Sequence, residues 1–240
     1  MYKNLKSAFT LAEMLVTLTI IGVIAALTIP SLNSNVQKNE TVSSLQKAHA
    51  TLSQAVERMR VEYGPIGIGK NWTDINTFWF GESTTQKGFL DKLNYVKFSN
   101  NKTNWSTRKI KQLNKQVDNN IPGYEVHTAD GMMYIFDDKT YCSTKGLSPD
   151  DTSKCLGRFV VDVNGKKGPN QYGIDIFFFA LVKYKGIVPA GEYSTADCQY
   201  GDKGITCAAK VLREGKINYS TKVPEPEGEG EGEGEGAGAG

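Results

Sequence analysis

The chain has 240 residues, 39% of them hydrophobic and 22% charged, and its formal net charge is +2. This size and composition fit a single globular domain on a stalk, with one core of about 150 residues. The sequence holds no HExxH or GxSxG motif, no phosphate-binding loop, and no GxGxxG motif at a strand–helix turn. We therefore do not expect an enzyme.

The first predicted element is an apolar helix from Phe9 to Ile29, in which Glu13 is the one ionisable residue. At about 1.5 Å per residue it would be roughly 30 Å long, enough to cross a bilayer core. Lys3 and Lys6 precede it, so the positive-inside rule keeps this end in the cytoplasm and exports the rest. A conventional signal peptide also has a basic end and an apolar run. However, a carboxylate in the membrane is costly, and no A-x-A cleavage site follows closely.

Residues 6–15, KSAFTLAEML, resemble the processing site of type IV prepilins and type II secretion pseudopilins. The resemblance implies that a prepilin peptidase cuts between Ala8 and Phe9 and that the new terminal Phe9 is methylated. Glu13 then becomes the fifth residue of the mature chain, where the family has its glutamate. Pro30 lies where many members have a helix-kinking proline. The family usually has glycine before the cut, where this chain has Ala8.

The predicted helix continues beyond the membrane as an amphipathic segment that ends at Gly64-Pro65. Its apolar stripe has the 3,4 spacing of a helix face that packs against the chain's own sheet; it consists of Val42, Leu45, His49, Leu52, Val56 and Met59. We interpret His49 as a partly buried core residue rather than a ligand or catalyst.

Residues 64 to about 122 show no clear pattern beyond a possible short helix around Lys87–Leu93. Basic residues surround Trp105 there, a combination that can hold nucleic acid; they are Lys102, Arg108, Lys109, Lys111 and Lys115. We interpret this cluster as a solvated basic face and do not expect nucleic acid as a partner.

Four strands are predicted after this region. Residues 124–129 and 132–137 alternate around Asp130-Gly131, a hairpin signal. Residues 158–163 form the third strand, with Phe159, Val161 and Val163 on one face. Residues 174–184 form the fourth, whose apolar run Ile176–Val182 should be covered on both faces.

The predicted fold class is α+β and pilin-like: a long N-terminal helix, membrane-spanning in its first half, packs on a four-stranded antiparallel sheet. The predicted divisions are a leader peptide (1–8), a transmembrane and filament-core helix (9–32), an amphipathic helix (33–63), a globular domain (64–223) and a disordered Glu/Gly-rich tail (224–240).

The four cysteines would lie in an oxidising compartment, where disulfides persist. Four cysteines allow three connectivities. We favour the two local pairs, Cys142–Cys155 and Cys198–Cys207, because short loops close most easily. A zinc site is the alternative, although no CxxC spacing or nearby histidine supports it.

The segment between the last two predicted strands begins Asp162-Val163-Asn164-Gly165 and resembles the start of a calcium loop. Asp162, Asn164 and Asp175 could supply side-chain oxygens to Ca²⁺, and some major pseudopilins bind calcium in a loosely similar loop. Two lysines lie inside the segment, and Asp, Asn and Gly also build ordinary turns. We favour the structural turn, with no cofactor.

The function implied by the resemblance is that of a structural subunit of a type IV pilus or a type II secretion filament. Its partners would be copies of itself, other pilins or pseudopilins, a prepilin peptidase, an inner-membrane assembly platform and membrane lipid. It would span the inner membrane once, with its C-terminal domain outside the cytoplasm, and then enter a pilus or periplasmic pseudopilus. The alternatives are a minor pilin that binds DNA or surfaces, and an anchored domain that never polymerises.

Overall fold

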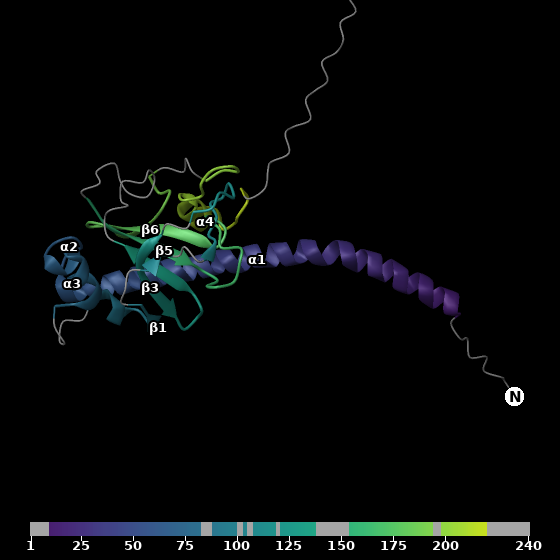
Figure 1. Ribbon diagram of the computed structural model, residues 1–240, viewed down its shortest axis with the longest axis horizontal. Coiled ribbons are helices and arrows are strands. Elements are labelled where there is room, and N and C mark those ends of the chain that lie inside the picture. Colours follow the sequence, from purple (N-terminus) through teal and green to yellow (C-terminus); the bar gives the residue numbers. More distant parts are fainter. Residues whose placement is uncertain are drawn as a thin grey trace, which may run out of the picture.

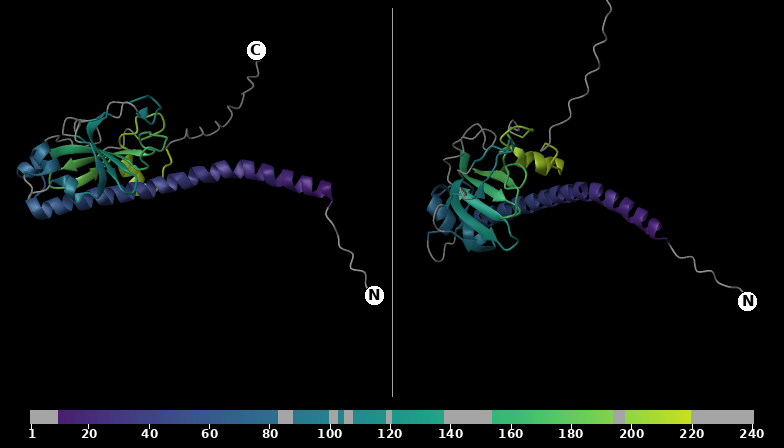
Figure 2. Two further views of the ribbon diagram at one scale, coloured as in Figure 1. Left: turned by 60° about the horizontal axis from the view of Figure 1, so that its bottom comes forward. Right: turned by 45° about the vertical axis from the view of Figure 1, so that its right-hand side comes forward.

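The computed structural model describes residues 10–82, 88–99, 103–104, 108–118, 121–137, 154–193 and 198–219. A long helix, α1, runs beneath an antiparallel sheet and then projects far beyond it (Figure 1). Two further views show no other described helix or strand beside the projecting half (Figure 2). The predicted α+β class, with a long N-terminal helix and an antiparallel sheet, is confirmed.

Helix α1 spans Leu11–Tyr63, 53 residues that rise over roughly 80 Å. Its backbone stays helical through residue 30, and its exposed half curves gently (Figure 1). A sharper kink at Pro30 stays a prediction. The helix ends where expected, at Gly64, whose φ of 80° suits glycine and whose N–H donates to the Arg60 carbonyl at 3.0 Å.

The sheet is larger than the four strands we predicted. The described residues form six strands in a row, ordered β1-β3-β4-β5-β6-β7, and every neighbouring pair is antiparallel. Their bounds are β1 Tyr95–Phe98, β3 Pro122–Thr128, β4 Met133–Asp137, β5 Cys155–Asp162, β6 Ile176–Val182 and β7 Gly186–Pro189. A two-residue strand, β2 (Thr103–Asn104), also pairs with β3.

The unpredicted strands lie at the two sides of the sheet, where sequence patterns are weakest. Strand β1 is mostly exposed, so it lacks the alternation that marks a half-buried strand. Strand β7 follows β6 after a tight turn, in which Lys185 N donates to the Val182 carbonyl at 3.1 Å. The predicted fourth strand therefore ran through this turn to Tyr184, whereas β6 ends at Val182.

Alternating side chains of the central strands enter two separate cores. Phe136, Phe159 and Phe179 are paired in register across β4, β5 and β6 and face α1. Val160 and Phe178 enter a second core on the opposite face. All seven residues of β6 are buried, as predicted from its apolar run.

The second half of α1 covers the first of these cores, as its spacing predicted. Five stripe residues are no more than 6% exposed: Val42, Leu45, Leu52, Val56 and Met59. Ala48 and Ala55 are buried beside them. The half-buried ring of His49 stacks on Phe179, with ring centroids 5.7 Å apart. This confirms the interpretation of His49 as a core residue.

Short helices close the ends of the globular part: α2 (Lys70–Thr73), α3 (Ile75–Phe80), the 3₁₀ helix η1 (Phe89–Lys92) and α4 (Cys207–Glu214). Element η1 lies within the predicted short helix. Trp79 contacts Phe78, Phe89 and Phe136, which ties α3 and η1 to the sheet. Helix α4 was not predicted; it packs against α1 and β6.

Candidate functional site

Helix α1 begins with a reciprocal cap formed by Thr10 and Glu13. Thr10 is the N-cap, and its hydroxyl oxygen accepts a hydrogen bond from Glu13 N at 3.2 Å. Glu13 Oε2 in turn accepts from the Thr10 backbone N and hydroxyl, each at 2.8 Å. The Thr-x-x-Glu spacing is a capping-box signal that we overlooked in the sequence. The cap fixes the position of the one carboxylate in the apolar segment. Ala8 and Phe9 lie outside the described residues.

The segment after this cap is apolar and exposed. Among the described residues, Leu11–Thr28 is the one helical segment long and apolar enough to cross a membrane. Its mean hydropathy is 2.1, and none of it is buried. Leu11, Leu18 and Leu27 are 81%, 65% and 75% exposed. An exposed apolar surface of this length marks an interaction site with lipid or with another apolar helix.

The threonines of this segment satisfy their own hydroxyl groups. Thr17 donates to the Met14 carbonyl at 2.9 Å, Thr19 to the Leu15 carbonyl at 2.8 Å, and Thr28 to the Ile24 carbonyl at 2.9 Å. Such local bonds lower the cost of placing a hydroxyl in hydrocarbon. These polar residues are therefore compatible with a membrane.

The three predicted calcium ligands come together at the end of β5. Asp162 and Asp175 are fully buried. Asp175 accepts hydrogen bonds from Asn170 N at 2.8 Å, Gln171 N at 2.6 Å and Asn164 Nδ2 at 3.2 Å. Burial raises the pKa of both aspartates, that of Asp162 to about 7. The Asp175 carboxylate therefore holds the turn together through these three hydrogen bonds. The same hydrogen bonds oppose the rise of the Asp175 pKa.

Arg108 reaches the same loop from a distant part of the sequence. Its guanidinium forms an ion pair with Asp162, and this pair opposes the burial-driven rise of the Asp162 pKa. The Arg108 side chain is 14% exposed. This member of the predicted basic face therefore points inward. Lys102 and Trp105 of that cluster lie outside the described residues.

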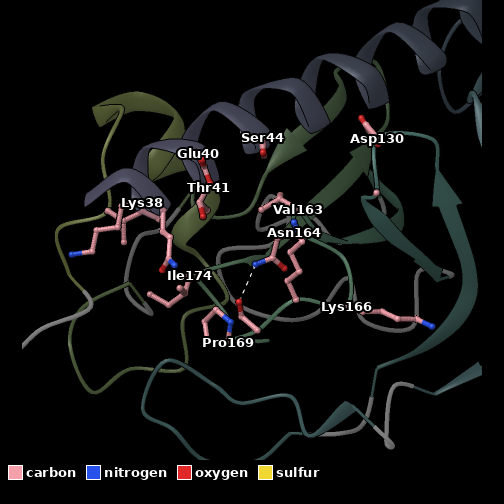
Figure 3. A pocket seen from close by; sticks show the side chains of 15 residues that line it. Lys38, Glu40, Thr41, Ser44, Asp130, Val163, Asn164, Lys166, Pro169 and Ile174 are labelled. Carbon is pink, nitrogen blue, oxygen red and sulfur yellow. Dashed lines mark hydrogen bonds between the residues drawn. The ribbon is translucent and has the colours of Figure 1, made fainter. Parts of the chain in front are cut away.

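A groove of about 940 Å³ separates the loop from α1 (Figure 3). Residues of α1 between Gln37 and Ser44 form one wall, and Val163–Pro169 form the other. In the close-up, Asn164 belongs to the loop wall, and its Nδ2 donates to the Gly168 carbonyl at 3.2 Å. Lys38, Lys166 and Lys167 line the groove. It opens where α1 leaves the globular part.

Gly165 fixes this loop against the β3–β4 turn. Its φ is 68°, and a Cβ there would lie 2.3 Å from the Gly131 carbonyl oxygen. Any larger residue would push the loop away from the hairpin. The turn itself forms as predicted, with Gly131 N donating to the Thr128 carbonyl at 3.0 Å.

Cys198 and Cys207 form a disulfide with a Cα–Cα distance of 4.9 Å. It ties the loop before α4 to the first residue of that helix. Cys155 is buried at the start of β5 and is also disulfide-bonded. Its predicted partner Cys142 lies outside the described residues, as does the Glu/Gly-rich tail. Within the described part of the chain, no group of three or more His, Cys, Asp or Glu is placed to hold a metal ion.

Comparison with known proteins bears on the N-terminal segment. No curated protein and no solved structure matches the chain. Residues 3–29 match the prokaryotic N-terminal methylation motif. The match includes Glu13 and all of the exposed apolar segment Leu11–Thr28. Such a motif implies processing by a peptidase and assembly with other pilins. At residues 3–29 the chain therefore carries the signature of type IV pilins and pseudopilins.

Proposed function

We propose that the chain is the precursor of a structural subunit, a pilin or pseudopilin, of a type IV pilus or a type II secretion filament. A prepilin peptidase cuts it after Ala8, and the subunit assembles through the helix of residues 9–32. The observation that carries this proposal is the exposed apolar half of α1 with its methylation motif. This half needs lipid before assembly and neighbouring apolar helices afterwards.

In this proposal, the Glu13 carboxylate forms an ion pair that guides assembly. Both hydrogen bonds that its carboxylate accepts from Thr10 go to Oε2. Cutting before Phe9 creates an amine close to this carboxylate, because Phe9 directly precedes the N-cap. In apolar surroundings an unmatched charge is costly and a matched pair is favoured. Pairing with the amine of a neighbouring subunit would set the step between subunits. Head-to-tail addition that does not close into a ring then gives a helical filament.

The location of the subunit follows from its charges. Lys3 and Lys6 hold the leader in the cytoplasm, so the sheet lies outside the inner membrane, where the disulfides form. The partners are copies of the chain, other pilins or pseudopilins, the prepilin peptidase, the inner-membrane assembly platform and lipid. The groove beside α1 lies where a subunit packed along the exposed half would meet the globular part.

The proposal is tested by the mature N-terminus. We expect Edman sequencing of protein co-produced with an active prepilin peptidase to begin at a methylated Phe9. With a catalytically inactive peptidase, the leader should remain. Ala8→Gly should be cut at least as fast, whereas the bulky Ala8→Leu should resist cleavage. A mature terminus beyond residue 25 would instead indicate a conventional signal peptidase and overturn the proposal.

A further inference from the structure

Three oxygens of the loop at residues 162–175 converge on one nitrogen of Arg108. This nitrogen, Nη2, donates to Asp162 Oδ2, to the Gly165 carbonyl at 2.6 Å and to Asn170 Oδ1 at 2.8 Å. A guanidinium Nη carries two hydrogens, fewer than the acceptors around it. Its positive charge, as well as directed hydrogen bonding, therefore gathers these oxygens.

The oxygens around Arg108 are of the types that a hard cation prefers. A carboxylate, a backbone carbonyl and an amide carbonyl are all common calcium ligands. They come from three separate points of the loop, so a cation at their centre holds the loop closed. Asp162 is fully buried, and a buried carboxylate needs a partner charge to remain ionised.

Calcium does not fit this loop while Arg108 is in place. A calcium ion takes six to eight oxygens. Here Asp162 is paired with Arg108, and both oxygens of Asp175 accept hydrogen bonds from backbone N–H groups. The amide nitrogen of Asn164 points at Asp175 and at the Gly168 carbonyl. A metal ion on Asp162 would also lie close to the guanidinium, which would repel it.

We propose that Arg108 is a built-in cation that takes the place of a metal ion in this loop. The loop thereby keeps its shape without divalent metal. Because Val163–Pro169 form one wall of the groove beside α1, the shape of that wall is also independent of metal. Removing the side chain of Arg108 would open these three oxygens to a divalent cation, whose remaining ligands would be water.

The test is thermal unfolding of the full chain in detergent, measured once with calcium and once with chelator. The fluorescence of the buried Trp72 and Trp79 reports the unfolding. The wild-type Tm should be the same in both. Arg108→Ala should lower the Tm in chelator by roughly 5–10 °C. Calcium should then restore part of this loss. The matched control is Lys109→Ala, which removes the adjacent exposed cation and should leave the Tm unchanged and insensitive to calcium.

A second variant covers the case in which Arg108→Ala does not fold. Adding Asp162→Asn to it removes the uncompensated carboxylate and should restore folding. The proposal is overturned if calcium raises the wild-type Tm. It is also overturned if Arg108→Ala loses stability but does not respond to calcium, since Arg108 and Asp162 would then be an ordinary buried ion pair. Failure of the double variant to fold would likewise contradict it.

Discussion

The two halves of α1 belong to one helix but differ in what covers them. From Leu11 to Thr28 the helix is apolar on all sides apart from Glu13 and three threonines, and no described residue of the chain covers it. From Val42 to Met59 it is amphipathic, and its apolar stripe is buried in the same core as side chains of β4, β5 and β6. The comparison shows that the apolar surface of the first half must be covered by lipid or by another chain. The apolar stripe of the amphipathic half is covered by the sheet of its own chain. Four experiments can break or sharpen this contrast.

The largest expected effect is on assembly, from the single carboxylate of the uncovered half. We expect Glu13→Val to abolish surface filaments while the amount of membrane protein and the disulfides stay normal, because no described residue of the globular part contacts position 13. Sheared filaments are compared with total membrane protein by immunoblot. The matched control is Glu57→Val, which changes an exposed glutamate in the covered half and should leave filament yield unchanged.

Two further variants separate the charge of Glu13 from its role as a cap. Glu13→Gln can still accept hydrogen bonds from Thr10 but has no charge, and it should also fail to assemble. Thr10→Val removes the capping hydroxyl but keeps the charge, so it should assemble nearly normally. Normal filaments from Glu13→Val would mean that apolar packing alone drives assembly.

The next effect is on folding, from the covered half. Leu52 is fully buried, so Leu52→Ala should lower the free energy of unfolding by about 2–5 kcal/mol. Leu18→Ala makes the same change in the exposed half and should leave the unfolding of the globular part unchanged. Urea titration of the full chain in detergent, followed by tryptophan fluorescence, measures both. Equal losses would show that the exposed half also packs on the globular part.

A smaller loss should follow when α4, which also packs on the covered half of α1, is released from its disulfide. Replacing both Cys198 and Cys207 with Ser should lower the free energy of unfolding by about 2–3 kcal/mol, because the unfolded chain is no longer cross-linked. The same urea titration gives the value. Peptide mapping of exported protein provides the check: free thiols at both positions would contradict the pairing and the exported orientation.

The smallest effect is a pH dependence from His49, at the contact of α1 with Phe179. Burial lowers the pKa of His49, and a hydrogen bond with the Ile187 backbone opposes this shift. Below about pH 6.5 the unfolded chain therefore binds this proton more readily than the folded chain, and stability falls as the pH drops. His49→Phe keeps a ring against Phe179 and should remove this part of the pH dependence.

The pH experiment needs a difference measurement, because Asp162 titrates in the opposite sense. Its pKa is raised to about 7, so its contribution to stability decreases as the pH rises from about 4 to 7. Subtracting the urea-derived free energies of His49→Phe from those of the wild type at pH 5.5 and 7.5 isolates the histidine. An identical pH dependence in both proteins would show that His49 has the same pKa in the folded and unfolded chain.

The sequence predicted those elements of the fold whose buried residues recur at the regular spacing of a helix or a strand. The 3,4 spacing of the stripe identified the covered half of α1, and alternation identified β3, β4 and β5 nearly to their ends. The exposed strand β1 and the four-residue β7 lack such a period. The helix α4 is short and was also missed. Local pattern is informative only where one face of an element is buried over several residues.

The candidate site divides in the same way. Glu13 and the apolar segment are contiguous in sequence, so both were predicted. The cap at Thr10 was overlooked, although the Thr-x-x-Glu spacing of a capping box indicates it. The loop is different. Asp162, Asn164 and Asp175 were grouped correctly as neighbours, but Arg108 lies 54 positions before Asp162. Its local surroundings are basic, and nothing there distinguishes an inward-pointing arginine from a solvated one. Such a long-range pairing requires the folded arrangement.

The length and continuity of α1 have a mechanical consequence. In the proposed assembly, a subunit drawn out of a bilayer is pulled along this rod, and the pull reaches the sheet through the contacts between Val42 and Met59. These contacts are spread over about 25 Å of the helix. A force parallel to the axis loads them together in shear, instead of peeling them apart one after another. The rod can therefore transmit traction to the globular part while sharing the load among many side chains.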